Sequence, residues 1–198
     1  ATNTGILAFG TGIASIVAAQ AVKTARGGSP DNSHSELSRG AFVTHVDASK
    51  QSLDWAHENA RLSNIPEGKI RWVLDDALSF VKREVRRGAS YDGIILDPPA
   101  FGRGAKGEVW KIEEDFLPLL ETLKELLSDK PGSFFLVNGY AAGYAPRSFA
   151  QAVESVFSAG GGPASGGGDV NGECGELHIK ESSSDRVVPA GIYVRFVR

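Results

Sequence analysis

Short apolar runs alternate with segments of helical periodicity through most of the 198 residues. Runs rich in β-branched and aromatic residues, typical of strands, are followed by apolar residues spaced three and four apart, typical of amphipathic helices. This alternation predicts mostly parallel strands with helices on both faces of one sheet, joined by right-handed crossovers. The strands expected from the pattern cover 5–9, 41–47, 69–74, 91–96 and 133–138.

The C-terminal part of the chain breaks this alternation. Two strand-like runs, GELHIKE and AGIYVRFV, follow each other with no helical pattern between them, which predicts an antiparallel hairpin at the end of the sheet. The expected fold is therefore a doubly wound, Rossmann-like α/β sheet of seven mostly parallel strands with one antiparallel strand near the C-terminus.

Helices are expected between and after the first five strands. Ser49 can cap the second helix, and Leu78, Val81 and Val85 lie on one face of the third. In the fourth, a long amphipathic helix, Pro118 is expected near the first turn, where proline removes no intrahelical hydrogen bond.

Composition limits the class of protein. Apolar residues make up 41% and charged residues 23%, which is ordinary for a globular domain. No apolar run approaches the roughly 20 residues that span a bilayer, and no secretion signal is evident, so we expect a cytoplasmic protein or one inside an organelle. Cys174 is the only cysteine, which excludes an internal disulfide and a cysteine-rich zinc site. A net charge of −3 argues against a free-standing nucleic-acid binder held by bulk electrostatics.

The chain length fits one domain. Segments 25–40 and 159–173, the second rich in glycine, are expected to be surface insertions. Because the chain opens with Ala1 and contains no methionine, we expect it to be a fragment or a processed product of a longer protein.

Small and acidic residues follow the carboxyl ends of the first five expected strands, the edge at which open α/β sheets bind ligands. In FGTGIAS, Gly10 and Gly12 precede a helix, where glycine lets the backbone turn tightly and approach a ligand. A tight strand-to-helix turn needs the same residues, and the third glycine of a dinucleotide fingerprint is absent. Asp47 can accept both hydroxyls of a ribose, although DASK can also simply cap the next helix.

Two further strand ends carry acids. Asp76 can accept a hydrogen bond from an adenine amino group, but Asp75 and Asp76 also lie where acids stabilise a helix N-terminus. In LDPPAFGRG, two prolines stop the strand directly after Asp97. The carboxylate and nearby carbonyls suit a flat amino-bearing group on whose face Phe101 can stack, and the alternative is a rigid turn and nothing more.

Four segments resemble the class I S-adenosylmethionine-dependent methyltransferases, and most nearly the bacterial-type ribosomal RNA large-subunit methyltransferases: THVDASKQSLDWAHENARL, IRWVLDDALSFVKRE, YDGIILDPPAFGRGAKGEVWK and GELHIKESSSDRVVPAGIYVRF. The resemblance implies S-adenosyl-L-methionine as cofactor and RNA, suspected to be ribosomal RNA, as substrate. The residues that it implies for the cofactor are Phe9, Gly10, Thr11, Gly12, Asp47, Ala48, Asp75, Asp76 and Ala77. The residues implied for the reaction are Asp97, Pro98, Pro99 and Phe101, with Arg103, Lys106, Trp110 and Lys111 expected to contact the substrate.

Three departures from the family pattern leave other functions open. The family's glycine loop is similar to F-x-Y-T-G-x-A-S, whereas FGTGIAS is one residue shorter and lacks the tyrosine, and segment 25–40 is an added insertion. Relatives that methylate cytosine C5 use a cysteine after the fifth strand, where LVNGYAAGYAP has none, so a nitrogen acceptor is favoured. The alternatives are a non-catalytic domain that keeps the fold and, less favoured, a nucleotide-dependent oxidoreductase that binds NAD.

Overall fold

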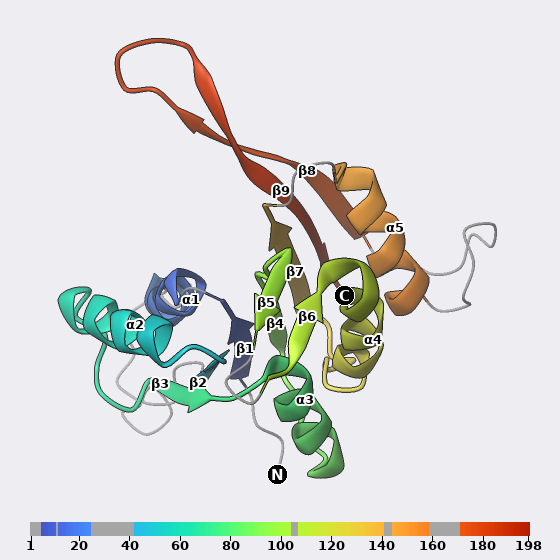
Figure 1. Cartoon of the computed structure of the whole chain (residues 1–198). Coiled ribbons are helices and arrows are strands. Elements are labelled where there is room, and N and C mark those ends of the chain that lie inside the picture. The colour runs from blue at the N-terminus through green and yellow to red at the C-terminus, as the bar shows by residue number, and fades with distance from the viewer. Residues whose placement is uncertain (1–4, 11, 25–41, 104–106, 141–143, 159–170) are drawn as a thin grey trace.

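A computed structural model describes residues 5–10, 12–24, 42–103, 107–140, 144–158 and 171–198 of the chain. Its main sheet has seven strands in the order β3-β2-β1-β4-β7-β9-β8 (Figure 1). Strand β9 runs antiparallel to both of its neighbours, and the other four pairings of this sheet are parallel. The strands are β1 (Gly5–Phe9), β2 (Phe42–Asp47), β3 (Ile70–Leu74), β4 (Gly93–Leu96), β7 (Phe134–Gly139), β8 (Asn171–Lys180) and β9 (Val187–Val197). The predicted fold class is confirmed.

Five helices of the described residues cover the two faces of the sheet. Helices α1 (Ile13–Thr24) and α2 (Lys50–Leu62) lie on one face. Helices α3 (Ala77–Arg86), α4 (Ile112–Lys124) and α5 (Pro146–Phe157) lie on the other (Figure 1). Each predicted helix is present, and Ser49 caps α2 as predicted, since its hydroxyl accepts a hydrogen bond from the Ser52 amide.

The central strands supply both halves of the hydrophobic core. All residues of β1 and β4 are buried, as expected of strands with helices on both faces. Because side chains alternate along a strand, Leu7 packs toward α3, α4 and α5 while Ile6 and Ala8 pack toward α1 and α2. Burial on both faces fixes the strand register, and with it the position of each strand end.

The prediction that Pro118 lies near the first turn of its helix is wrong. Helix α4 begins at Ile112, so Pro118 lies inside it. The Pro118 side chain is exposed, and the missing hydrogen bond would have joined it to the carbonyl of Glu114 on the solvent side. Phe116 and Leu119 on the buried face keep the helix against the sheet in spite of this loss.

A small hairpin of β5 (Phe101–Arg103) and β6 (Val109–Lys111) was not predicted. Its strands are too short to produce a recognisable period. Segment 25–40 lies outside the described residues, and of segment 159–173 only residues 171–173 are described, where they begin β8. No helix in the described ranges is long and apolar enough to cross a membrane.

Candidate active site

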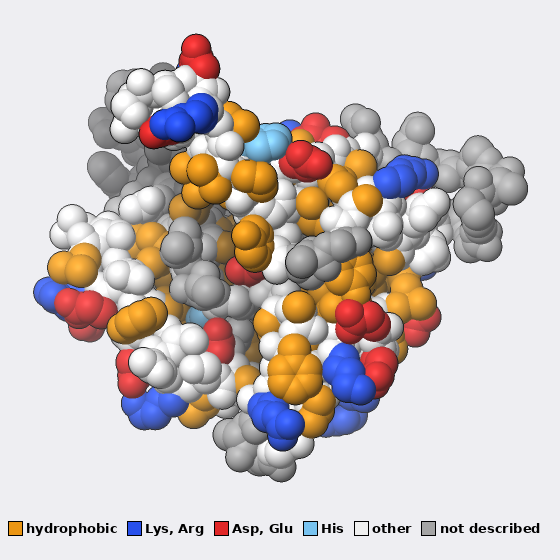
Figure 2. Space-filling view, turned by 45° about the horizontal axis from the view of Figure 1, so that its top comes forward, with side chains coloured by type: hydrophobic (Ala, Val, Ile, Leu, Met, Phe, Trp, Pro, Cys, Tyr) orange, Lys and Arg blue, Asp and Glu red, His pale blue; other side chains and the backbone are white. Residues whose placement is uncertain are grey.

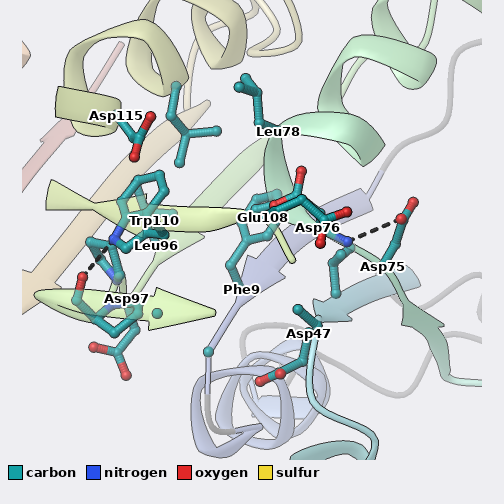
Figure 3. Close-up of a pocket in the computed structure, with 18 of the residues that line it drawn as sticks. Phe9, Asp47, Asp75, Asp76, Leu78, Leu96, Asp97, Glu108, Trp110 and Asp115 are labelled. Atoms are coloured by element: carbon teal, nitrogen blue, oxygen red, sulfur yellow. Dashed lines mark hydrogen bonds between the residues drawn. The ribbon is translucent and has the colours of Figure 1, made fainter. Parts of the chain in front are cut away.

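The carboxyl ends of β1, β2, β3 and β4 open into one cavity of about 620 Å³ (Figure 3). This volume lies in the range of about 300–1,000 Å³ that small-molecule sites occupy. The β5–β6 hairpin, the first half of α4 and the end of β7 complete its walls. In Figure 3, Asp97 and Trp110 lie to one side of Phe9, and Asp47, Asp75 and Asp76 lie to the other.

Glycine is needed at two positions of the loop after β1, and the structural reason differs between them. Gly10 has a φ of +115°, and a Cβ on it would lie 2.7 Å from the Cβ of Asp97, so only glycine allows the ends of β1 and β4 to approach each other. Gly12 has a φ of +83°, and its Cβ would lie 2.4 Å from the Cβ of Ala56 in α2. Gly10 lines the cavity, whereas Gly12 is placed against α2, and Thr11 lies outside the described residues.

Asp47 ends β2 and lines the cavity. Its Oδ1 accepts a hydrogen bond of 2.7 Å from the Ser49 amide, which fixes the carboxylate at the turn into α2. Burial raises the pKa of Asp47, and the hydrogen bond from Ser49 partly opposes this rise. Because Ser49 caps the helix, Asp47 is not needed as a cap, and the neighbouring Ala48 also lines the cavity.

Asp75 and Asp76 line the cavity and also stabilise the start of α3. Asp76 caps this helix through Oδ1, which accepts a hydrogen bond of 2.8 Å from the Ser79 amide. Asp75 accepts a hydrogen bond from the Asp76 amide, drawn in Figure 3, and forms an ion pair with Arg83. Both carboxylates are therefore held by the protein, and Ala77 joins them in the lining.

Asp97 is the first residue after β4 and lies at the centre of the predicted reaction site. Its Oδ1 accepts a hydrogen bond of 2.7 Å from the side-chain amide of Asn138 in β7. Burial raises the pKa of Asp97, and the Asn138 hydrogen bond acts in the opposite direction. Sequence reasoning did not single out Asn138, although its position at the end of the neighbouring strand was a usable signal.

Trp110 joins the hairpin to the proline turn. Its Nε1 donates a hydrogen bond of 2.7 Å to the carbonyl of Pro99, and the Ile112 amide donates one of 3.1 Å to the carbonyl of Ala100. Pro98, Pro99 and Trp110 all line the cavity. These bonds hold the turn after Asp97 in one shape and make the hairpin a fixed wall of the cavity.

The structure does not bring every predicted residue into the cavity. Phe101 is 54% exposed and lies outside the lining, as does Lys111, which forms an ion pair with Glu114 at the start of α4. Arg103 does line the cavity, and Lys106 lies outside the described residues. Tyr140, which sequence reasoning missed, lines the cavity and is 79% exposed. Its only sequence signal is its place just after the fifth strand of the alternating pattern.

The described lining of the cavity contains neither a cysteine nor a cluster of metal-ligating side chains. Cys174, the only cysteine of the chain, is exposed in β8 and is not among the lining residues. Among the residues that the structure describes, no group of three or more His, Cys, Asp and Glu side chains has the arrangement of a metal site.

Comparison with known proteins relates this chain to methyltransferases. No protein-family model matches the chain. It is 32% identical over 96 residues to the ribosomal RNA large subunit methyltransferase K/L of Pseudoalteromonas translucida, covering 48% of this chain and 13% of that protein. The protein of the same name from Shewanella frigidimarina is 27% identical over 128 residues, covering 64% of this chain and 17% of that protein.

Solved structures extend the similarity to the whole chain. A crystal structure of a SAM-dependent methyltransferase from Agrobacterium tumefaciens is 33% identical with a TM-score of 0.77, covering 100% of this chain and 57% of that one. SMU.776, solved in complex with SAH, shares the fold at 22% identity and a TM-score of 0.63, covering 100% of this chain and 46% of that one. The predicted resemblance to S-adenosylmethionine-dependent methyltransferases is confirmed, and the chain spans only part of the relatives that it matches.

Proposed function

We propose that the chain is the single catalytic domain of an S-adenosylmethionine-dependent methyltransferase that methylates a nitrogen of an RNA base, with ribosomal RNA as the suspected substrate. The observation that carries this proposal is the continuity of one cavity from Asp47 and Asp76 to Asp97 and its two prolines. A cofactor that fills the first part of such a cavity ends next to an acceptor in the second part.

The residues present fit the cofactor. Gly10 leaves the backbone bare at a point where a side chain could not be accommodated, next to Asp97. Asp47 supplies a fixed carboxylate for ribose hydroxyls, and Asp76 supplies a second for an adenine amino group. The bound cofactor would supply a methyl group already activated by a positively charged sulfur, so the protein mainly has to position the acceptor and stabilise charge.

A nitrogen acceptor agrees with the side chains around Asp97. When an amino nitrogen gains a methyl group, it must lose a proton, and Asp97 lies where it can accept one. The raised pKa of Asp97 makes its carboxylate a better base than an exposed aspartate. Methylation of cytosine C5 through a cysteine nucleophile is disfavoured, because Cys174 lies in β8 away from the lining.

The names of the relatives support an RNA substrate, and two residues of the cavity lining, Arg103 and Tyr140, agree with it. Acidic, basic and hydrophobic side chains are interspersed on the face shown in Figure 2, so no single basic patch covers it. Among the described residues Arg103 is the basic one in the cavity lining, and its guanidinium can contact a phosphate of the substrate. Tyr140 offers an exposed ring on which a base can stack, a role that its position favours over Phe101.

Calorimetry and a transfer assay together test the proposal. We expect S-adenosylmethionine and its demethylated product to bind in the micromolar range and NAD not to bind. With labelled methyl donor and ribosomal RNA, we expect incorporation that is lost in Asp97→Ala and retained in Asp54→Ala, a control on the exposed face of α2. Cofactor binding without transfer to any RNA would support a non-catalytic domain, and binding of NAD alone would support an oxidoreductase.

A further inference from the structure

The Asp97 carboxylate lies between the ends of two neighbouring strands, one of which holds it by a hydrogen bond. The sheet places β4 between β1 and β7, so the residues at the ends of these three strands lie side by side. On the β7 side, the Asn138 amide donates to Oδ1 at 2.7 Å. On the β1 side, the position that a Cβ of Gly10 would take is 3.2 Å from Oδ2. The carboxylate therefore has one oxygen engaged by an amide and the other directed toward the glycine loop.

We propose that Asn138 is a positioning residue, which holds Asp97 so that Oδ2 alone is presented to the methyl acceptor beside the glycine loop. This inference rests on the proposed methyltransferase function and assigns a role that the fold by itself does not require. Residue 138 lies on β7 with its backbone paired to Tyr193 of β9, and that pairing does not depend on which side chain is present.

An asparagine suits this position better than the charged alternatives. A lysine or arginine would form an ion pair with Asp97 and reduce its ability to accept a proton. A neutral amide donor orients the carboxylate while leaving its negative charge uncompensated. A hydrogen bond to a charged group is stronger than one between neutral groups, so this contact favours one rotamer of Asp97.

The other charged groups of the cavity do not replace this contact. The charged residues that line the same cavity as Asp97 are Asp47, Asp75, Asp76, Arg103, Glu108 and Asp115. Of these, Asp75 is paired with Arg83, Asp76 caps α3, and an oxygen of Asp115 accepts a hydrogen bond from the Lys111 amide. Burial and the Asn138 hydrogen bond are the causes that govern the pKa of Asp97, in that order.

The test measures the pKa of Asp97 in the full chain. NMR records the chemical shift of its side-chain carboxyl carbon during a pH titration. We expect the pKa of Asp97 to rise in Asn138→Ala, and to rise further in Asn138→Asp, where a second carboxylate faces the first. Asn138→Ser, which keeps a donor, should restore part of the difference. The matched control is Leu136→Ala, which removes a packed side chain two residues earlier on the same strand and should leave the titration of Asp97 unchanged.

Transfer kinetics give the second readout. In Asn138→Ala we expect kcat to fall at least tenfold, the acidic limb of its pH profile to move to higher pH, and cofactor affinity to change less than threefold. An unchanged Asp97 titration in folded Asn138→Ala and Asn138→Asp would overturn the positioning role, as would an unchanged kcat profile. If the wild-type chain transfers no methyl group to any acceptor, the proposed function fails, whereas the NMR titration still decides whether Asn138 controls Asp97.

Discussion

Acidification should destabilise this fold through one buried histidine. His45 lies in β2 with only 1% of its surface exposed, between the sheet and α1. Its Nδ1 is 2.8 Å from the Ser15 hydroxyl, its ring packs edge-on against Trp72, and its Nε2 has no hydrogen-bond partner among the described residues. Burial, and to a lesser extent the charge of nearby His57, lowers the pKa of His45 from 6.5 to about 4.

The sign and the size of the effect follow from these two values. Between pH 6.5 and 4 the unfolded chain binds a proton at residue 45 and the folded chain does not, so the free energy of unfolding falls as the pH is lowered. At 1.36 kcal/mol per pKa unit, the difference between 6.5 and 4 corresponds to about 3 kcal/mol. The full contribution is present above pH 6.5 and is lost by about pH 4. A loss of this size is a large fraction of the roughly 5–15 kcal/mol that stabilises a typical domain.

Urea unfolding followed by circular dichroism, at constant ionic strength and several pH values, measures this contribution. His45→Gln keeps a polar partner for Ser15 but cannot titrate. Its free energy of unfolding should therefore decrease less than that of the wild type as the pH falls. His57→Gln, a substitution at an exposed residue of α2, is the control and should reproduce most of the wild-type dependence. The raised pKa values of Asp47 and Asp97 have the opposite effect, because they increase the free energy of unfolding as the pH falls. This effect is common to all three proteins and cancels in the comparison. Parallel pH dependences for wild type and His45→Gln would refute the reasoning.

Three further predictions concern the cavity and its support. Asp47→Ala should weaken S-adenosylmethionine binding by roughly 1–3 kcal/mol, measured by calorimetry, because hydrogen bonds to a buried ribose are lost; an unchanged Kd would remove Asp47 from the site. Tyr140→Ala should raise the KM for RNA about tenfold or more, as expected for losing roughly 1–3 kcal/mol of base stacking, whereas Phe101→Ala should raise it less. The reverse order would restore the stacking role to Phe101. Gly12→Ala should lower stability by about 1–3 kcal/mol in thermal unfolding, because its Cβ would lie 2.4 Å from that of Ala56 at a φ of +83°. A melting temperature equal to that of wild type would show that the start of α1 can move away from α2 without loss of stability.

The fold class and the edge of the sheet that carries the site were readable from the sequence. Alternation of strand-like and helix-like periods reflects burial on two faces, which is a local property of each segment. Strand ends marked by Gly10, Asp47, Asp76 and Asp97 converge because parallel strands present their carboxyl ends at one edge. The turn formed by the two prolines was likewise evident from the chemistry of proline alone.

The tertiary structure alone decided which of these residues act on one another. Asn138 and Asp97 are 41 positions apart in sequence, and only the adjacency of β4 and β7 brings them within 2.7 Å. The β5–β6 hairpin, the bond from Trp110 to Pro99 and the exclusion of Phe101 from the cavity have the same origin. Sequence periodicity reports which face of an element is buried, but distances between side chains on different elements arise only when the strands pair and the core packs. Local patterns along the chain therefore suffice to predict the sheet and its ligand-binding edge, whereas core packing sets how the carboxylate at the centre of the site is held.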